Sequence, residues 1–401
     1  MSLNDTPSSE RVHIGIFGMR NAGKSSLMNA ITGQPLAIVS ETAGTTTDPV
    51  RKSMELLPVG PVLLIDTPGI DDVGELGEKR VEKARQVLRQ TDVAVLVMDA
   101  SRGKSDSDAA LLRLFESTDV PHVTVYNKCD LLESRPAIDK DEIFVSSVTG
   151  ENIEALKERI AGLARAEDER LRIVGDLLHP SDFVVLVVPI DKAAPKGRLI
   201  LPQQQTIRDI LEADATAVVV KEFELRETLG ALGKRPRIVI TDSQVFAKAS
   251  ADTPTDIPLT SFSILMARYK GVLDTSVRGA LTLEKISDGD KILISEGCTH
   301  HRQCDDIGTV KLPRWIRQYT GKKPDFEFTS GGAFPDDLSP YRLIVHCGAC
   351  MLNEREMKYR QMEAVSQGVP ITNFGVLIAH MQGILKRSVS VFPHLTAEFE
   401  D

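Results

Sequence analysis

One glycine-rich stretch of the chain has the residue types of a phosphate-binding loop. Residues 18–25 read GMRNAGKS and fit the pattern G-x-x-x-x-G-K-[ST] at every fixed position. Glycines let backbone N–H groups approach phosphate oxygens closely, Lys24 can reach the β- and γ-phosphates, and Ser25 can bind Mg²⁺. A glycine-rich turn can match such a pattern by chance, so the elements next to it decide whether these residues form a phosphate-binding loop. An apolar run typical of a buried strand, residues 12–17, comes directly before this one.

Two further elements suit the phosphate side of a nucleotide site. The sequence DTPG at 66–69 follows a second apolar run. At the end of that strand Asp66 can hold the Mg²⁺ shell, and the N–H group of Gly69 can contact the γ-phosphate. GTTTD at 44–48 lies between the first helix and the Asp66 strand, where a switch threonine would close on Mg²⁺.

Two more elements suit the base side. NKCD at 127–130 follows another apolar run. The carboxylate of Asp130 can accept hydrogen bonds from N1 and N2 of guanine, a donor pair that adenine does not present. Ser146 and Ser147 then complete a base pocket. Cys129 occupies the variable position of this motif, and we expect it to be a small buried side chain.

These five elements, in this order, resemble the P-loop GTPases. The resemblance implies a GTP site formed by Gly18, Asn21, Ala22, Gly23, Lys24, Ser25, Ser26, Asp66, Gly69, Asn127, Lys128, Asp130, Ser146 and Ser147.

Asn21 and the GTTTD switch are similar to those of the TrmE-like and Era-like GTPases. The resemblance implies that Asn21 binds K⁺ and that Thr46, or its neighbour Thr45, joins Ser25 and Asp66 at Mg²⁺. Lys24, Thr46 and Asn21 would then be the catalytic residues. An asparagine that merely stabilises the turn is the alternative for Asn21.

The residue after DTPG is Ile70 and not the glutamine that orients water in Ras-like enzymes. We therefore expect slow hydrolysis that suits a switch, and the resemblance to the TrmE-like and Era-like GTPases implies that K⁺ stimulates it.

A second group of residues could bind a soft metal. Three of the five cysteines follow predicted strands: Cys298 comes after residues 291–294, and Cys347 and Cys350 come after residues 343–345. Loops at the same edge of a parallel sheet can bring these thiolates together, as zinc or an iron–sulfur cluster requires. The spacing leaves three alternatives open: a cluster, a zinc site, and unliganded core cysteines. The fourth ligand is ambiguous among His300, His346 and Cys304.

Together with the GTPase elements, the pattern C-x-H … H-C-x-x-C at 298–300 and 346–350 resembles the FeFe-hydrogenase maturation GTPases, the HydF family. The resemblance implies a 4Fe-4S cluster held by Cys298, Cys347 and Cys350, with His300 and His346 as the fourth ligand or as neighbouring groups that tune the site. Cys304 and His301 are not part of that pattern.

It also implies a scaffold or carrier role. The protein would receive a diiron subcluster made with two radical-SAM maturases and deliver it to apo FeFe-hydrogenase. A homodimer formed by the middle domain belongs to the same expectation.

The elements that must position these residues alternate along the chain. Predicted strands cover residues 12–17, 62–65, 93–98, 122–126, 143–145, 183–189, 217–220, 237–240, 257–259, 291–294, 325–329 and 343–345, and predicted helices cover residues 24–32, 76–89, 108–115, 153–164, 203–212, 222–232, 243–249 and 261–269. This pattern predicts an α/β protein of three α/β domains, the first a P-loop GTPase with a mostly parallel sheet. The predicted bounds are 1–168 for the GTPase domain, 172–270 for the dimerisation domain and 271–401 for the cluster domain.

The composition excludes several classes of protein. The chain has 401 residues, 42% hydrophobic and 26% charged, which indicates globular domains. The apolar runs are shorter than the roughly 18 residues that span a bilayer, and the first ten residues do not resemble a signal peptide. We expect a cytoplasmic protein without a membrane partner.

An Era/TrmE-like GTPase of RNA modification or ribosome assembly, with a zinc-bearing C-terminal domain, is the alternative function. The net charge of −9 and the aromatic content of 5% count against nucleic-acid binding. A basic group in the third domain, with the members Arg302, Lys311, Arg314, Arg317, Lys322 and Lys323, indicates a solvated helix face or a docking surface for an acidic partner.

Overall fold

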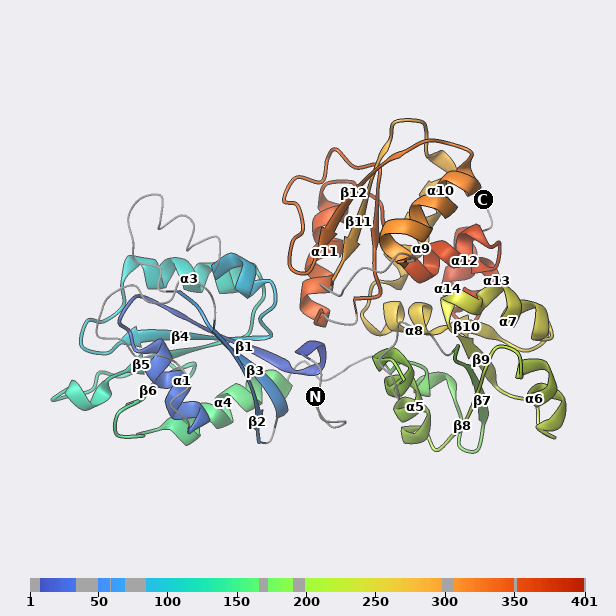
Figure 1. Ribbon diagram of the computed structural model, residues 1–401. Coiled ribbons are helices and arrows are strands. Elements are labelled where there is room, and N and C mark those ends of the chain that lie inside the picture. The colour runs from blue at the N-terminus through green and yellow to red at the C-terminus, as the bar shows by residue number, and fades with distance from the viewer. Residues whose placement is uncertain are drawn as a thin grey trace. The chain divides into compact units, whose positions relative to one another are not determined.

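The computed structural model describes residues 8–33, 50–57, 59–68, 84–165, 172–189, 199–297, 306–349 and 352–399. The chain divides into two compact units, Met1–Glu169 and Arg170–Asp401, which are described separately (Figure 1). No helix in the described ranges is both long and apolar enough to cross a membrane.

The first unit contains a six-stranded sheet in the order β2-β3-β1-β4-β5-β6. Its strands are β1 (Val12–Gly18), β2 (Val50–Leu56), β3 (Gly60–Asp66), β4 (Val93–Asp99), β5 (His122–Asn127) and β6 (Glu142–Phe144). Strand β2 pairs with β3 in the antiparallel direction, and the other neighbours are parallel. The helices of this unit are α1 (Lys24–Thr32), α3 (Asp106–Ser117) and α4 (Ile153–Arg165).

Both faces of this sheet are covered, as β4 shows. Val93, Val95 and Val97 join a core that includes residues of α1 and α4. The alternate residues of the strand join a second core on the other face, with α3 and the helical residues 84–88. Because successive side chains of a strand point to opposite faces, a strand covered on both sides is a continuous apolar run.

The second unit contains two four-stranded sheets, in the orders β10-β9-β7-β8 and β12-β11-β13-β14, and all their neighbouring strands are parallel. The strands are β7 (Phe183–Val187), β8 (Thr216–Val220), β9 (Ile238–Thr241), β10 (Leu259–Ser261), β11 (Lys291–Glu296), β12 (Asp325–Ser330), β13 (Leu343–His346) and β14 (Ile371–Asn373).

The helices of this unit cover the sheets and join them. They are α5 (Leu201–Glu212), α6 (Leu225–Ala231), α7 (Phe246–Asp252), α8 (Phe262–Tyr269), α9 (Leu273–Leu281), α10 (Leu312–Thr320), α11 (Glu354–Ser366), α12 (Phe374–Met381), α13 (Leu385–Val389) and α14 (Pro393–Thr396). Helices α8, α9 and α12 pack against one another (Figure 1). One hydrophobic core contains residues of both sheets and of these helices.

The predicted fold class is confirmed, because parallel strand pairs dominate every sheet and helices alternate with the strands along the chain. Two strands escaped prediction. Strand β2 is an edge strand whose burial alternates, and β14 has three residues. The predicted helix at 76–89 falls mostly outside the described residues. The second unit holds both of the sheets that the sequence analysis assigned to separate domains, and the boundary at 271 stays a prediction.

Strand β8 lies at the edge of its sheet and carries apolar side chains into solvent. Val219 is 46% exposed, and Phe223, just beyond the strand, is 77% exposed. An exposed apolar edge is a surface on which strands of another chain can pair.

Candidate functional site

The GMRNAGKS loop connects β1 to α1, and its backbone requires glycine at two positions. Gly18 has a φ of +142°, and a Cβ atom there would lie 2.2 Å from the backbone oxygen of Val97. Gly23 has a φ of +92°, and its Cβ atom would lie 2.2 Å from Nδ2 of Asn127. Real Cβ atoms do not approach other atoms so closely, so these glycines let the loop run against β4 and the base-side loop.

Lys24 is directed into this loop. Its side chain is buried, and Nζ donates hydrogen bonds to the backbone oxygens of Gly18 at 3.0 Å and Met19 at 2.8 Å. The ammonium therefore lies at the inner side of the loop that would surround the phosphates, where its charge can act on the β- and γ-phosphate oxygens.

Asp66 and Ser25, the predicted Mg²⁺ ligands, are in contact with each other. Ser25 Oγ donates to Asp66 Oδ2 at 2.6 Å, while Asp66 Oδ1 is buried and has no hydrogen-bond partner. Burial raises the pKa of the Asp66 carboxyl, and the Ser25 hydrogen bond and the Lys24 charge oppose that shift. A buried carboxylate oxygen without a partner is unfavourable unless a cation completes it, so these residues fit Mg²⁺.

The base-side motif is tied directly to the phosphate loop. Asn127 Nδ2 donates to the backbone oxygen of Ala22 at 3.1 Å, and its Oδ1 accepts from the backbone and the hydroxyl of Ser147. Lys128 Nζ donates to the backbone oxygen of Asn21 at 2.8 Å. These hydrogen bonds fix the phosphate loop and the base-side motif relative to each other, which a nucleotide that contacts both requires.

Lys128 has a second partner that the sequence analysis missed. Asp99, at the end of β4, accepts a hydrogen bond from Lys128 Nζ at 2.7 Å. Burial raises the pKa of Asp99, but hydrogen bonds from Lys128 and Ser101 outweigh it and lower the pKa below its ordinary value. A carboxylate at the end of an apolar strand was the signal that could have identified it.

The remaining predicted GTP residues divide into described and undescribed ones. Asp130 is exposed, and Ser146 is buried and accepts from the backbone of Val148 and Thr149. Cys129 is fully buried, as expected for its small side chain. Thr45, Thr46, Gly69 and Ile70 lie outside the described residues.

Asn21 has a φ of +61° and an exposed side chain. Asparagine tolerates this left-handed conformation better than most residues do. The backbone therefore gives one reason for asparagine here, and the binding of K⁺ stays a prediction.

The strand ends around Cys347 have the predicted arrangement. Strands β11 and β13 are parallel neighbours in which Ser295 pairs with His346, and the backbone N–H of Cys347 donates to the oxygen of Ser295 at 2.9 Å. The N–H group of Gly297 donates to Cys347 Sγ at 3.0 Å. The residue before Cys298 is therefore in contact with the thiol of Cys347.

The environment of Cys347 suits a thiolate. Its Sγ accepts hydrogen bonds from the backbone N–H groups of Gly297 and, at 3.3 Å, of Ala349. Such donors stabilise the charged form, which is the form that binds metals. This donor set fits a thiolate ligand of an iron–sulfur cluster. Cys298, His300, His301, Cys304 and Cys350 lie outside the described residues, and the described residues alone contain no group of three metal-binding side chains.

His346 is fully buried and lies between two partners. Its Nδ1 is 2.9 Å from the backbone oxygen of Cys347, and its Nε2 is 3.0 Å from a guanidinium nitrogen of Arg360. Burial, together with the positive charge of Arg360, lowers the pKa of His346 to about 3. The imidazole is therefore neutral at physiological pH.

The loop after β13, which carries Cys347, also accepts hydrogen bonds from a residue just beyond α8. Lys270, which follows α8, is buried, and its Nζ donates to the backbone oxygens of Ala349 and Leu352. A small pocket beside this loop is lined by Lys270, His346, Cys347 and Gln361, among other residues. Both Lys270 and Arg360 are buried cations whose role the sequence analysis missed, because neither lies near a cysteine in the sequence.

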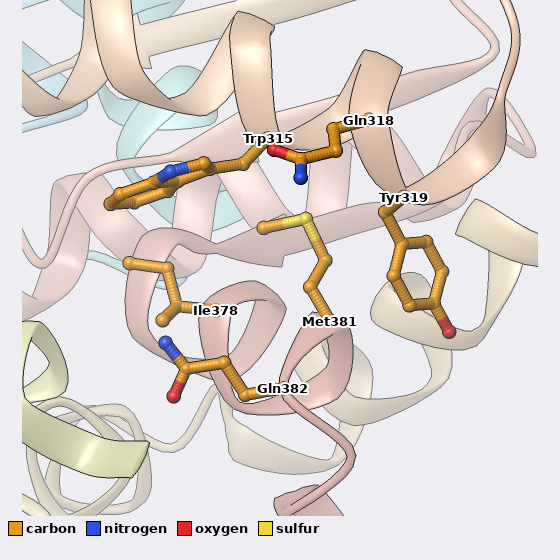
Figure 2. A pocket seen from close by; sticks show the side chains of 6 residues that line it. All are labelled: Trp315, Gln318, Tyr319, Ile378, Met381 and Gln382. Atoms are coloured by element: carbon orange, nitrogen blue, oxygen red, sulfur yellow. The ribbon is translucent and has the colours of Figure 1, made fainter. Parts of the chain in front are cut away.

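A larger pocket of about 380 Å³ lies between α10 and the end of α12 (Figure 2). In Figure 2 the side chain of Met381 extends from α12 toward α10, between Trp315 and Tyr319. The other lining residues are Gln318, Ile378 and Gln382. This lining offers no thiol, imidazole or carboxylate, so it does not suit a metal.

Three family models match the chain. Residues 13–128 match the 50S ribosome-binding GTPase model. Residues 173–271 match the hydrogen maturase F dimerization domain, and residues 274–391 match the hydrogen maturase F tetramerization domain. The two hydrogen maturase F models together cover more than half of the chain.

Curated relatives match about two fifths of the chain. The tRNA modification GTPase MnmE of Xanthomonas oryzae pv. oryzae is 38% identical over 156 residues, which are 38% of this chain and 34% of that protein. MnmE of Legionella pneumophila is 39% identical over 153 residues, with the same shares. The match thus spans about a third of the length of these relatives.

Solved structures of GTP-binding proteins are also similar to part of the chain. A variant of Era from Aquifex aeolicus bound to GDP and AlF4⁻ has 21% identity and a TM-score of 0.35, and the match covers 55% of this chain and 98% of that one. A probable GTP-binding protein EngB has 25% identity and a TM-score of 0.32, with 39% of this chain and 100% of that one covered.

Proposed function

Because this chain belongs to the hydrogen maturase F family, we propose that it is a GTPase scaffold for the maturation of FeFe-hydrogenase. It holds a 4Fe-4S cluster on Cys298, Cys347 and Cys350, receives a diiron subcluster made with two radical-SAM maturases, and delivers that unit to the apo-hydrogenase. The observation that carries this proposal is the Gly297 N–H···Sγ hydrogen bond to Cys347, because it supports the convergence of two cysteine-bearing loops.

GTP hydrolysis is assigned to the first unit, which carries the GTPase domain. Lys24 would neutralise the charge on the β- and γ-phosphates, and Ser25 and Asp66 would hold Mg²⁺. With Ile70 in place of a water-orienting glutamine, we expect slow turnover that K⁺ at Asn21 accelerates. Equal GTP turnover in K⁺ and Na⁺ buffers would refute the potassium part of this proposal.

Three thiolates leave one coordination position of a 4Fe-4S cluster for an exchangeable ligand. Such a position can anchor a cargo through a bridging ligand and release it by exchange, which a cluster with four cysteine ligands cannot do. The diiron unit is the cargo of this proposal. The exposed basic residues Arg314, Arg317, Lys322 and Lys323 would attract an acidic surface of a maturase or of the hydrogenase, and this attraction would be strongest at low salt.

Self-association belongs to the same proposal, since the chain carries dimerization and tetramerization domains. The apolar edge of β8, with Val219 and Phe223 in solvent, supports a homodimer formed by the middle part of the chain. We propose that the assembly acts in the cytoplasm, where reduced thiols persist.

A cysteine series tests the cluster proposal. After anaerobic reconstitution, we expect the visible absorbance of the cluster to be lost in Cys298→Ala, Cys347→Ala and Cys350→Ala and kept in Cys304→Ala. The opposite pattern contradicts the assignment. Zinc in place of iron in the wild-type protein would instead favour an Era/TrmE-like GTPase of RNA modification or ribosome assembly.

A further inference from the structure

We infer that Arg360 makes His346 a positioning residue, which orients Cys347 and is not the fourth ligand of the cluster. The inference rests on the proposed function, because it assigns a role toward the proposed cluster. Its basis is the set of hydrogen bonds around the His346 ring and the burial of the guanidinium beside it.

The Arg360 guanidinium is fixed on every side. Its side chain is 0% exposed, and it donates to Glu356 Oε1 at 2.8 Å, to the backbone oxygen of Gly331 at 3.0 Å and to Ser295 Oγ at 3.4 Å. It also lies over the ring of Phe334, 5.0 Å from the centroid. A buried guanidinium with this set of partners cannot turn away without leaving donors unsatisfied.

This fixed donor decides the tautomer of His346. Arginine has no acceptor, so Nε2 of His346 must accept the hydrogen bond from Arg360 through its lone pair. The proton of the neutral ring is then on Nδ1, which donates to the backbone oxygen of Cys347. Neither nitrogen has a lone pair left for iron.

The consequence is a chain of contacts that ends at the backbone of Cys347. Arg360 holds the imidazole, the imidazole holds the backbone oxygen of Cys347, and the N–H of Cys347 donates to Ser295. Groups that orient a metal ligand through hydrogen bonds are a recurrent feature of metal sites. His346 therefore positions the ligand Cys347, and the fourth coordination position belongs to another group.

Two substitutions at His346 separate positioning from ligation. In His346→Gln the amide oxygen can still accept from Arg360, whereas His346→Leu has similar volume and no acceptor. We expect His346→Gln to retain the iron of the wild type after desalting and to leave the pulsed-EPR spectrum of the reduced cluster unchanged, including any coupling to directly bound nitrogen. We expect His346→Leu to lose iron. The matched control is His300→Gln, which changes the other histidine of the motif.

Loss of a directly bound nitrogen signal in His346→Gln would overturn the inference and leave the proposed function intact. Absence of iron from the wild-type protein would instead refute the proposed function. In that case ¹⁵N spectra of histidine-labelled apoprotein still decide the inference. The resonances that His346→Gln removes should belong to an Nδ1–H tautomer, and an Nε2–H tautomer or an imidazolium overturns the inference.

Discussion

Two ion pairs on helix α11 have the same spacing and very different surroundings, and they offer a matched test of the buried network. Arg360 and Glu356 are 0% and 4% exposed, with Nε and Oε1 2.8 Å apart. Lys358 and Glu354 are four residues apart on the same helix and are 53% and 37% exposed. Replacing Arg360 by methionine leaves the buried Glu356 carboxylate without its counterion.

The expected magnitudes differ several-fold. Removing one partner of a buried pair costs about 3–5 kcal/mol of unfolding free energy, so we expect Arg360→Met to lose an amount in this range. An exposed pair of this spacing contributes about 0.3–0.5 kcal/mol, so Lys358→Met should lose no more than that. The double variant Arg360→Met/Glu356→Met removes both buried charges and should recover part of the loss, because no unpaired charge remains while the other acceptors of Arg360 stay unpaired.

Urea unfolding of the apoprotein, followed by tryptophan fluorescence, measures these changes. Trp315 is the chain's single tryptophan and lies in the same unit as α11, so its signal reports the unit concerned. Equal losses in Arg360→Met and Lys358→Met would refute the reasoning. A double variant as unstable as Arg360→Met would show that the loss comes from packing and not from the unpaired charge.

Three further predictions concern the GTPase unit. Gly23→Ala should weaken GTP binding in a titration, because the new Cβ atom would lie 2.2 Å from Asn127 Nδ2. Gly33 also has a positive φ but a Cβ atom there meets nothing within 4 Å, so Gly33→Ala should leave GTP affinity unchanged and cost only about 1–2 kcal/mol of stability. Equal GTP affinities of the two variants would contradict the steric argument. Asp66→Asn should lower Mg²⁺-dependent GTP turnover more than about tenfold in a phosphate-release assay, since an amide has no charge to offer the cation; turnover at the wild-type rate would show that Mg²⁺ is held elsewhere. The pKa of Asp99 is lowered in the folded protein, so its carboxylate stabilises the fold fully above pH 3.8, and this stabilisation is lost as the pH falls through the lower folded pKa. The difference in unfolding free energy between the wild type and Asp99→Asn should therefore be constant near neutral pH and narrow below about pH 4. A difference that grows in acid would contradict this expectation.

The sequence predicted the elements whose burial makes them continuous apolar runs. Strands β1, β4 and β7 are covered on both faces, so their composition alone identifies them. Strand β2 was missed because an antiparallel edge strand with alternating exposure, VRKSMEL, has no such run. Strand β14 was missed because its three residues, ITN, include two polar ones and form no apolar run.

The candidate sites were predictable where the motif is local and not where the partner is distant in the sequence. The GMRNAGKS loop and the position of Cys347 follow from residues that adjoin a strand end. Asp99, Lys270 and Arg360 act through contacts with residues 29, 79 and 14 positions away, which only the fold brings together. The charges of Lys270 and Arg360 gave no signal, because a lysine or arginine is ordinarily solvated.

The central claim is that the cysteines at 298, 347 and 350 hold iron and sulfide. Metal and acid-labile sulfide analysis of the anaerobically purified wild-type protein tests it most directly. We expect about four iron and four sulfide per protomer, the content of one 4Fe-4S cluster. Zinc without sulfide, or a protein free of metal after reconstitution, would contradict it.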